Sequence, residues 1–197
     1  IWNNIGKISG SMYNNDAYNG RYTPVVDCSS WAFCAWINLD SVVSNMGIFS
    51  RQGDNNLNLE FPNTLGTAIN MYTGVAHTFT VPQLGGGHWS HVCVTQAAGD
   101  GIRAYVNKTE STSGKLTGTL VSTGTTQINV GARQDADALE IDGRIQDFRQ
   151  YCTNITEAEM DRVFNNGTAR LLDDDAIARE AITTYNTSIR EPGDDIT

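Results

Sequence analysis

The sequence is poor in basic residues. It has 13 Lys and Arg against 22 Asp and Glu, which gives a net charge of −9 at pH 7. It has no cluster of Lys or Arg that could neutralise the phosphates of nucleic acid, and the acidic charge also opposes binding to anionic membrane surfaces. No apolar run approaches the roughly 18 residues of a membrane-spanning helix. These absences argue against nucleic-acid partners and against membrane insertion.

The start of the chain lacks a methionine and has no charged-then-apolar segment of the kind found in signal peptides. We therefore expect a processed chain or a fragment of a longer protein. A length of 197 residues suits a single domain, or one domain with an appendage.

The four cysteines, at positions 28, 34, 93 and 152, lack the C-x-x-C spacing of zinc or thioredoxin-type sites. They could be free thiols in the core, or disulfide bonds of a secreted protein. Four N-x-S/T sequons favour the second interpretation; their acceptors are Asn107, Asn154, Asn166 and Asn186. We therefore predict a secreted, extracellular glycoprotein.

Short runs rich in β-branched and aromatic residues follow one another along the chain, separated by Gly, Asn and Asp. The predicted strands are 8–13, 31–39, 46–51, 56–61, 67–73, 77–81, 89–96, 102–107, 116–122, 127–131 and 141–151. About ten to twelve strands with turns at this spacing predict an all-β sandwich of two antiparallel sheets.

The run Trp89–Gln96 is apolar on both faces, which predicts an interior strand. The run Trp31–Leu39 has the same character. Each run carries one cysteine, so we expect a bond between Cys34 and Cys93 that pins the core. The run Asn56–Phe61 instead alternates apolar and polar residues, which predicts a half-buried strand.

The large aromatic and histidine side chains of these runs are expected to be structural. Trp31, Trp36 and Trp89 are predicted core residues. The three histidines, His77, His88 and His91, show no metal-ligand spacing and no pattern of a nucleophile with its base. We expect His91 to be a partly buried packing residue.

Two helices are predicted after the strands. Thr156 and Glu159 form a capping box, and this short helix should run to Phe164. A second, amphipathic helix is predicted at 173–189. The predicted organisation is a β domain at 1–169, a helical extension at 170–190 and an acidic flexible tail at 191–197.

The order of landmarks resembles the laminin-G-like and pentraxin group within the concanavalin A-like lectin/glucanase jelly rolls. The segments that carry the resemblance are "FCAWINLDS", "GIFSRQGDNNLNLEF", "GHWSHVCVTQ", "INVGARQD", "DGRIQDFRQY" and "ITEAEMDRVFNNG". Together they span about residues 31–167. The resemblance implies a jelly roll of two packed antiparallel sheets, which in this group binds glycans, proteins or phospho-ligands.

The resemblance also implies a disulfide between Cys34 and Cys93, where pentraxins have theirs. Cys28 precedes the strand at 31–39, and Cys152 follows the strand at 141–151. If those two strands are antiparallel neighbours, Cys28 and Cys152 meet at one edge. We therefore predict a second bond between them.

A calcium site is the third implication of the resemblance. The expected ligands, at the places of the pentraxin ligands, are Asp54, Asn55, Gln134, Asp135 and Asp137. They offer the oxygen atoms that Ca²⁺ prefers. However, Arg133 stands where pentraxins have a glutamate ligand, and the acidic loop after it is short. One Ca²⁺ ion and two ordinary polar loops both remain open as interpretations.

A glycosidase is not expected. The run Glu140-Ile141-Asp142 resembles the opening of the E-x-D-x-x-E motif of β-glucanases, but Ile145 stands at the third position. Without a second glutamate, the strand lacks the acid that this hydrolysis requires. We predict a protein that is not an enzyme.

Two functions remain. The first is a non-catalytic recognition module for a glycan or protein ligand, with Tyr18, Tyr22 and Tyr72 as candidate ligand-binding residues. The alternative is a structural subunit of a glycosylated extracellular filament, coat or surface appendage, which forms a homo-oligomer through the helix at 173–189.

Overall fold

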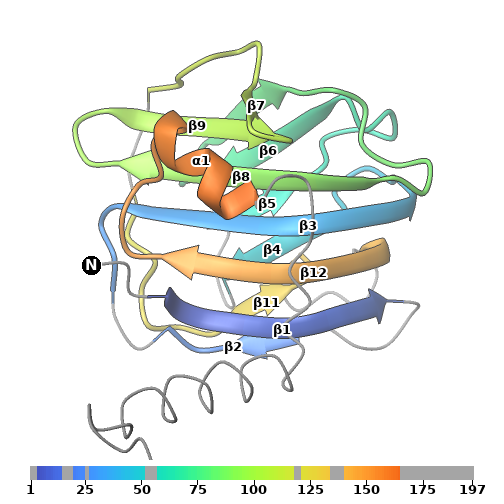
Figure 1. Cartoon of the computed structure of the whole chain (residues 1–197), viewed down its shortest axis with the longest axis horizontal. Coiled ribbons are helices and arrows are strands. Elements are labelled where there is room, and N and C mark those ends of the chain that lie inside the picture. The colour runs from blue at the N-terminus through green and yellow to red at the C-terminus, as the bar shows by residue number, and fades with distance from the viewer. Residues whose placement is uncertain are drawn as a thin grey trace, which may run out of the picture.

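The computed structural model describes residues 4–14, 20–24, 27–51, 57–117, 121–133 and 140–164. Two antiparallel sheets lie face to face (Figure 1). Sheet A has the order β1-β12-β3-β8-β9-β10, and sheet B has the order β2-β11-β4-β5-β6-β7. The predicted all-β sandwich is confirmed.

The strands of sheet A are β1 (Asn4–Asn14), β3 (Trp31–Ser41), β8 (Trp89–Ala97), β9 (Gly101–Val106), β10 (Thr109–Glu110) and β12 (Asp142–Tyr151). The strands of sheet B are β2 (Gly20–Tyr22), β4 (Gly47–Arg51), β5 (Asn58–Glu60), β6 (Ala68–Tyr72), β7 (Ala76–Thr80) and β11 (Ile128–Val130). One helix, α1 (Glu157–Phe164), lies in front of sheet A in Figure 1.

The main core fills the space between the sheets. Phe33 of β3 stacks on Phe49 of β4 with ring centroids 4.4 Å apart, so aromatic rings from opposite sheets meet at its centre. Phe148 of β12 closes the group, 5.9 Å from Phe49. Removal of this apolar surface from water is the main stabilising contribution of the sandwich.

β3 and β8 lie in the middle of sheet A, with Cys34 directly opposite Cys93. The predicted disulfide between these two residues is confirmed. Its predicted place in the core needs correction: Val92 and Val94 face the main core, whereas Cys93 belongs to a second buried cluster on the outer face.

Helix α1 covers that outer face. Its residues Met160 and Val163 are buried against the second cluster, beside Cys34 and Cys93. Phe164 stacks on Trp36 with ring centroids 5.3 Å apart. The helix therefore supplies the apolar partner that allows both faces of the central strands to be buried.

The predicted capping box starts this helix. The backbone N–H of Thr156 donates to Glu159 Oε2 at 3.0 Å, and the Thr156 hydroxyl donates to the same oxygen at 2.7 Å. Glu157 and Glu159 place negative charge in the first turn, where the helix dipole favours it.

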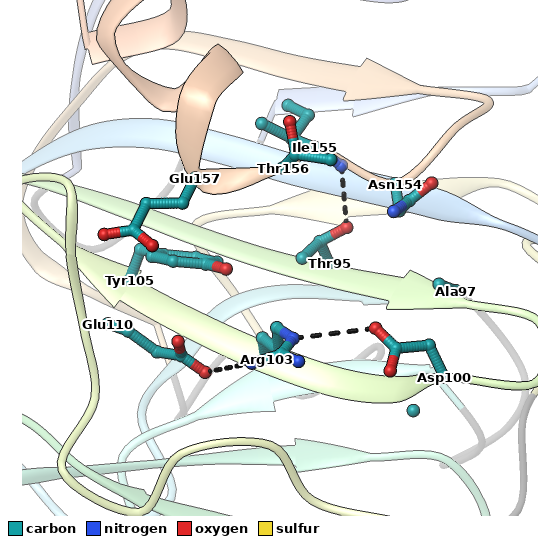
Figure 2. A pocket seen from close by; sticks show the side chains of 11 residues that line it. Thr95, Ala97, Asp100, Arg103, Tyr105, Glu110, Asn154, Ile155, Thr156 and Glu157 are labelled. Atoms are coloured by element: carbon teal, nitrogen blue, oxygen red, sulfur yellow. Dashed lines mark hydrogen bonds and ion pairs between the residues drawn. The ribbon is translucent and has the colours of Figure 1, made fainter.

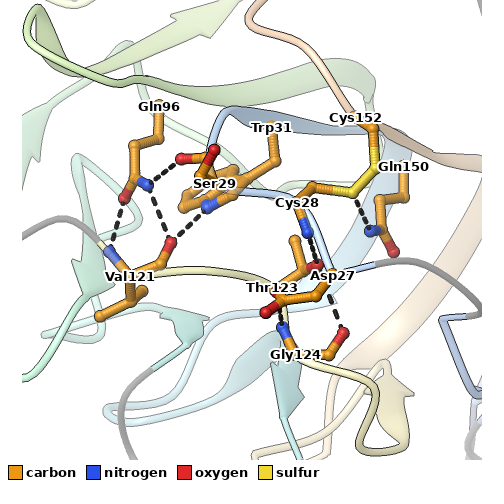
Figure 3. The surroundings of a disulfide bond; sticks show 10 residues. All are labelled: Asp27, Cys28, Ser29, Trp31, Gln96, Val121, Thr123, Gly124, Gln150 and Cys152. Carbon is orange, nitrogen blue, oxygen red and sulfur yellow. Dashed lines mark hydrogen bonds between the residues drawn. A yellow bond between two sulfur atoms is a disulfide. The ribbon is translucent and has the colours of Figure 1, made fainter.

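The second predicted disulfide, between Cys28 and Cys152, is also confirmed (Figure 3). The Cys28 N–H donates to Thr123 Oγ1 at 2.9 Å, and Gln150 Nε2 donates to Cys28 Sγ at 3.8 Å. Close by, Gln96 Nε2 donates to the Val121 carbonyl at 2.8 Å. These bonds join segments that lie far apart in the sequence at one edge of the core.

Three local predictions are wrong. Trp89 is not a core residue. It is the residue with which β8 begins, and it is 37% exposed. His91 is fully rather than partly buried. The predicted strand at 116–122 is reduced, among the described residues, to a single bridge between Leu116 and Ile102.

In the part of the chain that the structure describes, no helix is long and apolar enough to cross a membrane. The predicted helix at 173–189, the rest of the extension and the tail lie outside the described residues.

Candidate functional site

The five predicted calcium ligands, Asp54, Asn55, Gln134, Asp135 and Asp137, lie outside the described residues. The strands that flank their loops are described. The first loop joins β4 to β5, and the second follows β11. β4 pairs with both β5 and β11, so the stems of the two predicted loops stand on neighbouring strands of sheet B.

After β11 the chain crosses the outer face of β4. Gly131, whose φ of 87° permits the turn, donates its N–H to the Ile48 carbonyl at 2.8 Å. The Ser50 hydroxyl donates to the Ala132 carbonyl at 3.0 Å. A Cβ atom on Gly47 would lie only 2.4 Å from Arg133 N, so a side chain there would collide with the crossing backbone. Glycine at 47 therefore makes the crossing possible.

A buried polar cluster lies on the same face. Glu60 is 1% exposed. Its Oε2 accepts one hydrogen bond from Asn58 Nδ2 at 2.8 Å and forms an ion pair with Arg133 Nε at 3.0 Å. Burial raises the pKa of Glu60, while the Asn58 hydrogen bond and the positive charge of Arg133 partly oppose that rise. Arg133 thus compensates a carboxylate that has lost its water.

The predicted half-buried strand at 56–61 needs correction for this reason. Asn58 and Glu60 face outward as the alternation predicts, but both are buried because the segment after β11 covers that face. Asn58 Oδ1 is buried without a hydrogen-bond partner.

The cluster continues toward the edge strand β7. Tyr72 pairs with Asn58 in the register, and Asn70 pairs with Glu60. The Thr78 hydroxyl donates to Asn70 Oδ1 at 2.7 Å. Tyr72 is half-buried and Thr78 is exposed. The outer face of sheet B therefore presents an aromatic ring beside amide, hydroxyl and carboxylate groups.

The predicted ligand-binding tyrosines do not form one group in the described structure. Tyr18 lies outside the described residues, and of Tyr22 only the backbone, in β2, is described. The strands β11, β4 and β5 separate Tyr22 from Tyr72 in sheet B. Tyr72 is therefore the one candidate of the three whose side chain can be placed.

A pocket of about 280 Å³ lies on the other side of the molecule, on the outer face of sheet A beside α1 (Figure 2). Its lining residues are Thr95, Ala97, Asp100, Gly101, Arg103, Tyr105, Glu110, Asn154, Ile155, Thr156 and Glu157. Of these residues only Asn154 was a predicted site residue, as a glycan acceptor. The sequence signal that could have indicated a pocket is the polar pair Arg103 and Tyr105, which alternates with the apolar inward residues of β9.

The described sequons differ in their surroundings. Asn107 is exposed in the turn after β9, and its Oδ1 accepts a hydrogen bond from the His91 N–H at 2.9 Å. Asn154 is half-buried at the pocket. Asn166 and Asn186 lie outside the described residues. Glycosylation remains a prediction for all four.

The buried histidines are neutral packing groups. Burial, with a smaller contribution from the charge of Arg149, lowers the pKa of His91 to about 3. Burial also lowers the pKa of His77, whose Nε2 lies 2.9 Å from Thr73 Oγ1. Among the residues that the structure describes, no three His, Cys, Asp or Glu side chains are grouped to hold a metal ion.

Comparison with known families finds a match over residues 15–161, to the model described as the Concanavalin A-like lectin/glucanases superfamily. No curated protein sequence matches the chain.

Several solved structures share the fold. Domain 4 of AbnA, a GH43 extracellular arabinanase from Geobacillus stearothermophilus in complex with arabinotriose, is 16% identical with a TM-score of 0.57, covering 80% of this chain and 79% of that one. The binding domain of botulinum neurotoxin DC in complex with SialylT is 15% identical, with a TM-score of 0.55. The match covers 81% of this chain and 42% of the toxin chain. The receptor-binding domain of botulinum neurotoxin type G is 13% identical, with a TM-score of 0.56. The match covers 85% of this chain and 44% of the toxin chain. The chain spans less than half of either toxin chain, and these identities establish a shared fold alone.

Proposed function

The chain belongs to the concanavalin A-like lectin/glucanase superfamily, and from this membership we propose that it is a non-catalytic extracellular module that binds carbohydrate through the outer face of sheet B. Two of its structural neighbours are complexes, one with arabinotriose and one with SialylT. Because a fold hosts many functions, the proposal depends on the site itself.

The observation that carries the proposal is the position of Tyr72 beside the buried polar cluster. Carbohydrate sites combine an apolar or aromatic surface with a few precisely placed polar groups. The Tyr72 ring supplies the surface. The exposed Thr78 hydroxyl and the Asn70 amide supply polar groups at the surface. Beneath them the buried Asn58 and Glu60, fixed by their hydrogen bond and by the Arg133 ion pair, hold this part of the sheet in place. Side chains that are already held in place lose little conformational entropy when a ligand binds.

Calcium is part of this proposal. The residues that would hold the ion are the predicted ligands in the loops at 52–56 and 134–139. Ca²⁺ takes oxygen ligands, and two oxygens near the loop stems, Asn58 Oδ1 and Glu140 Oε2, are buried without a hydrogen-bond partner. The repulsion expected from Arg133 is reduced because Glu60 neutralises it. When bound, the ion would supply a fixed positive charge to ligand hydroxyls.

The absence of catalysis is also proposed. Glycoside hydrolysis requires a pair of carboxyl groups across the scissile bond. Asp142 Oδ2 accepts a hydrogen bond from the Ser41 hydroxyl at 2.7 Å, and Ile145, at the position of the motif's second glutamate, is buried in the core. The two disulfides support an oxidising, extracellular location.

A glycan array probed with the secreted chain, in Ca²⁺ and in EDTA, tests this function. We expect binding that requires Ca²⁺ and that falls by more than about tenfold in Tyr72→Ala, since loss of an anchoring aromatic costs about 2 kcal/mol or more. Trp89→Ala, a change to an exposed aromatic of sheet A, is the matched control and should bind as the native chain does. Equal binding by both variants would remove Tyr72 from the site.

The alternative, a filament or coat subunit that assembles through the helix at 173–189, remains a prediction because that helix lies outside the described residues. Light scattering distinguishes it. Concentration-dependent polymers, together with no binding on the array, would favour the structural role.

A further inference from the structure

The pocket beside α1 has a floor and a wall from different elements. Thr95 of β8 and Arg103 and Tyr105 of β9 form the floor. The wall is the segment that leads into α1. It is held in place because Ile155 N–H donates to Thr95 Oγ1 at 3.0 Å and the Ile155 side chain is buried. The shape of the pocket therefore depends on contacts between residues far apart in the sequence.

The charges of the pocket are largely compensated within it. Arg103 Nη1 donates to Glu110 Oε1 at 2.7 Å, and Arg103 Nε lies 3.7 Å from Asp100 Oδ2. Lys115 Nζ binds the other oxygen of Asp100 at 2.9 Å. Glu157 adds one more carboxylate. The remaining negative charge disfavours an anion, while the density of donors and acceptors suits a neutral molecule rich in hydroxyl or amide groups.

Tyr105 adds a hydroxyl group to the lining of the pocket. Burial, and then the nearby charge of Glu110, raises the pKa of Tyr105, so the hydroxyl keeps its proton. A protonated tyrosine hydroxyl can donate a hydrogen bond to an acceptor on a ligand in the pocket.

The sequon Asn154-Ile155-Thr156 forms part of the same pocket. Asn154 lines the pocket on one side, and Tyr105 and Glu157 line it on the other. In Figure 2, Thr95 and Thr156 lie between the two sides. Because Asn154 lines the pocket, a group attached to its amide nitrogen would begin at the pocket.

We propose that the pocket holds the first N-acetylglucosamine of an N-linked glycan carried by Asn154. At about 280 Å³ the pocket lies just below the roughly 300–1,000 Å³ of sites for drug-sized ligands, so it suits a short saccharide. The sugar is neutral, and its hydroxyl and acetamide groups can bond Tyr105 and the pocket carboxylates. The proposal rests on the extracellular location proposed above, but not on glycan recognition by sheet B.

The first test uses chain secreted from a eukaryotic host, with its glycans kept in the high-mannose form. Glycopeptide mass spectrometry should find Asn154 occupied. Trimming each glycan to one N-acetylglucosamine should leave the Tm unchanged, whereas Asn154→Gln should lower it by roughly 2–4 °C. The same Gln variant made without glycans in a bacterial periplasm measures the effect of the substitution itself. Thr109→Ala removes the exposed Asn107 sequon and should leave the Tm unchanged.

The second test probes the contact directly. We expect a nuclear Overhauser effect between the acetyl methyl of the trimmed sugar and the Tyr105 ring. Tyr105→Phe should reduce the glycan-dependent part of the Tm difference. An unoccupied Asn154 would overturn the proposal, as would an occupied Asn154 without this Overhauser effect or without any glycan-dependent Tm difference. None of these three outcomes bears on the glycan array, so the two proposals fail independently.

Discussion

The outer faces of the two sheets are both covered, but by different means. On sheet A, α1 places Met160 and Val163 on an apolar cluster around the Cys34–Cys93 disulfide. On sheet B, backbone after β11 crosses β4 and places Arg133 over Glu60 and Asn58. The first covering is stable through burial of apolar surface. The second depends on each polar group finding a partner.

The two coverings leave different groups for a ligand. On sheet A the apolar contacts under α1 bury the disulfide cluster, and polar groups gather in the pocket beside the helix. The face of sheet B keeps oriented amides and a carboxylate next to the half-buried Tyr72. Buried polar groups contribute little net stability compared with apolar packing but fix a unique geometry, which is what a recognition surface requires.

The largest expected effect is on the side of sheet A. Replacing both Cys34 and Cys93 by Ala should lower the free energy of unfolding by about 4 kcal/mol, because the bond closes a loop of about sixty residues in the unfolded chain. Urea denaturation measures this. Carbohydrate binding by sheet B should persist at low temperature. A loss below about 1 kcal/mol would show that packing under α1, rather than the disulfide, holds this face.

The second effect is on sheet B. Arg133→Met leaves the buried Glu60 carboxylate without its cation and should destabilise the chain by about 2–3 kcal/mol at pH 7. It also removes a charge that lowers the Glu60 pKa, so that pKa rises further. A carboxyl with a raised folded-state pKa gains stability as the pH falls through that pKa, so the deficit should shrink toward pH 4.5.

Urea unfolding at several pH values gives the measurement. The double variant Glu60→Gln with Arg133→Met is the control, because a neutral amide in place of the carboxylate should remove the pH dependence of the deficit. If the deficit of Arg133→Met stays constant with pH, Glu60 is not the group that Arg133 compensates.

A third prediction concerns acid stability on sheet A. With a pKa of about 3 in the folded chain and about 6.5 when unfolded, His91 stays neutral while the unfolded chain gains a proton as the pH falls. This lowers stability by up to about 1.4 kcal/mol for each pH unit between those values. His91→Phe keeps a ring against Trp36 and should remove this slope, which Tm measurements from pH 4 to 7 would detect. Parallel curves for the two proteins would contradict the assignment.

The smallest expected effect on the free energy of unfolding is that of Arg103→Met, which is the matched comparison for Arg133→Met. Arg103 pairs with Glu110 on sheet A, with side chains 31% and 28% exposed. Arg103→Met should change the free energy of unfolding by less than about 1 kcal/mol, and the change should shrink at high salt. An effect as large as that of Arg133→Met would mean that burial does not distinguish the two ion pairs.

Local patterns in the sequence predicted much of the fold. The alternation of Trp89–Gln96 placed β8 inside a sheet, and Thr156 with Glu159 marked the start of α1. The disulfide between Cys28 and Cys152 followed from the expected order of strands. The candidate site was predicted less well. Tyr72 lies beside polar groups, but its role in ligand binding stays a prediction, and the calcium loops lie outside the described residues.

The sequence by itself determined which residues alternate and where the helix begins, because strand periodicity and capping depend on near neighbours. The cysteine pairs were predicted from the family resemblance and from an expected order of strands, and the tertiary structure brings them together. The tertiary structure decided what covers each outer face. It buried Glu60 under the segment of Arg133, left Trp89 exposed and brought Asn154 to Tyr105. Those outcomes depend on contacts between segments some fifty or more residues apart, which no local pattern records.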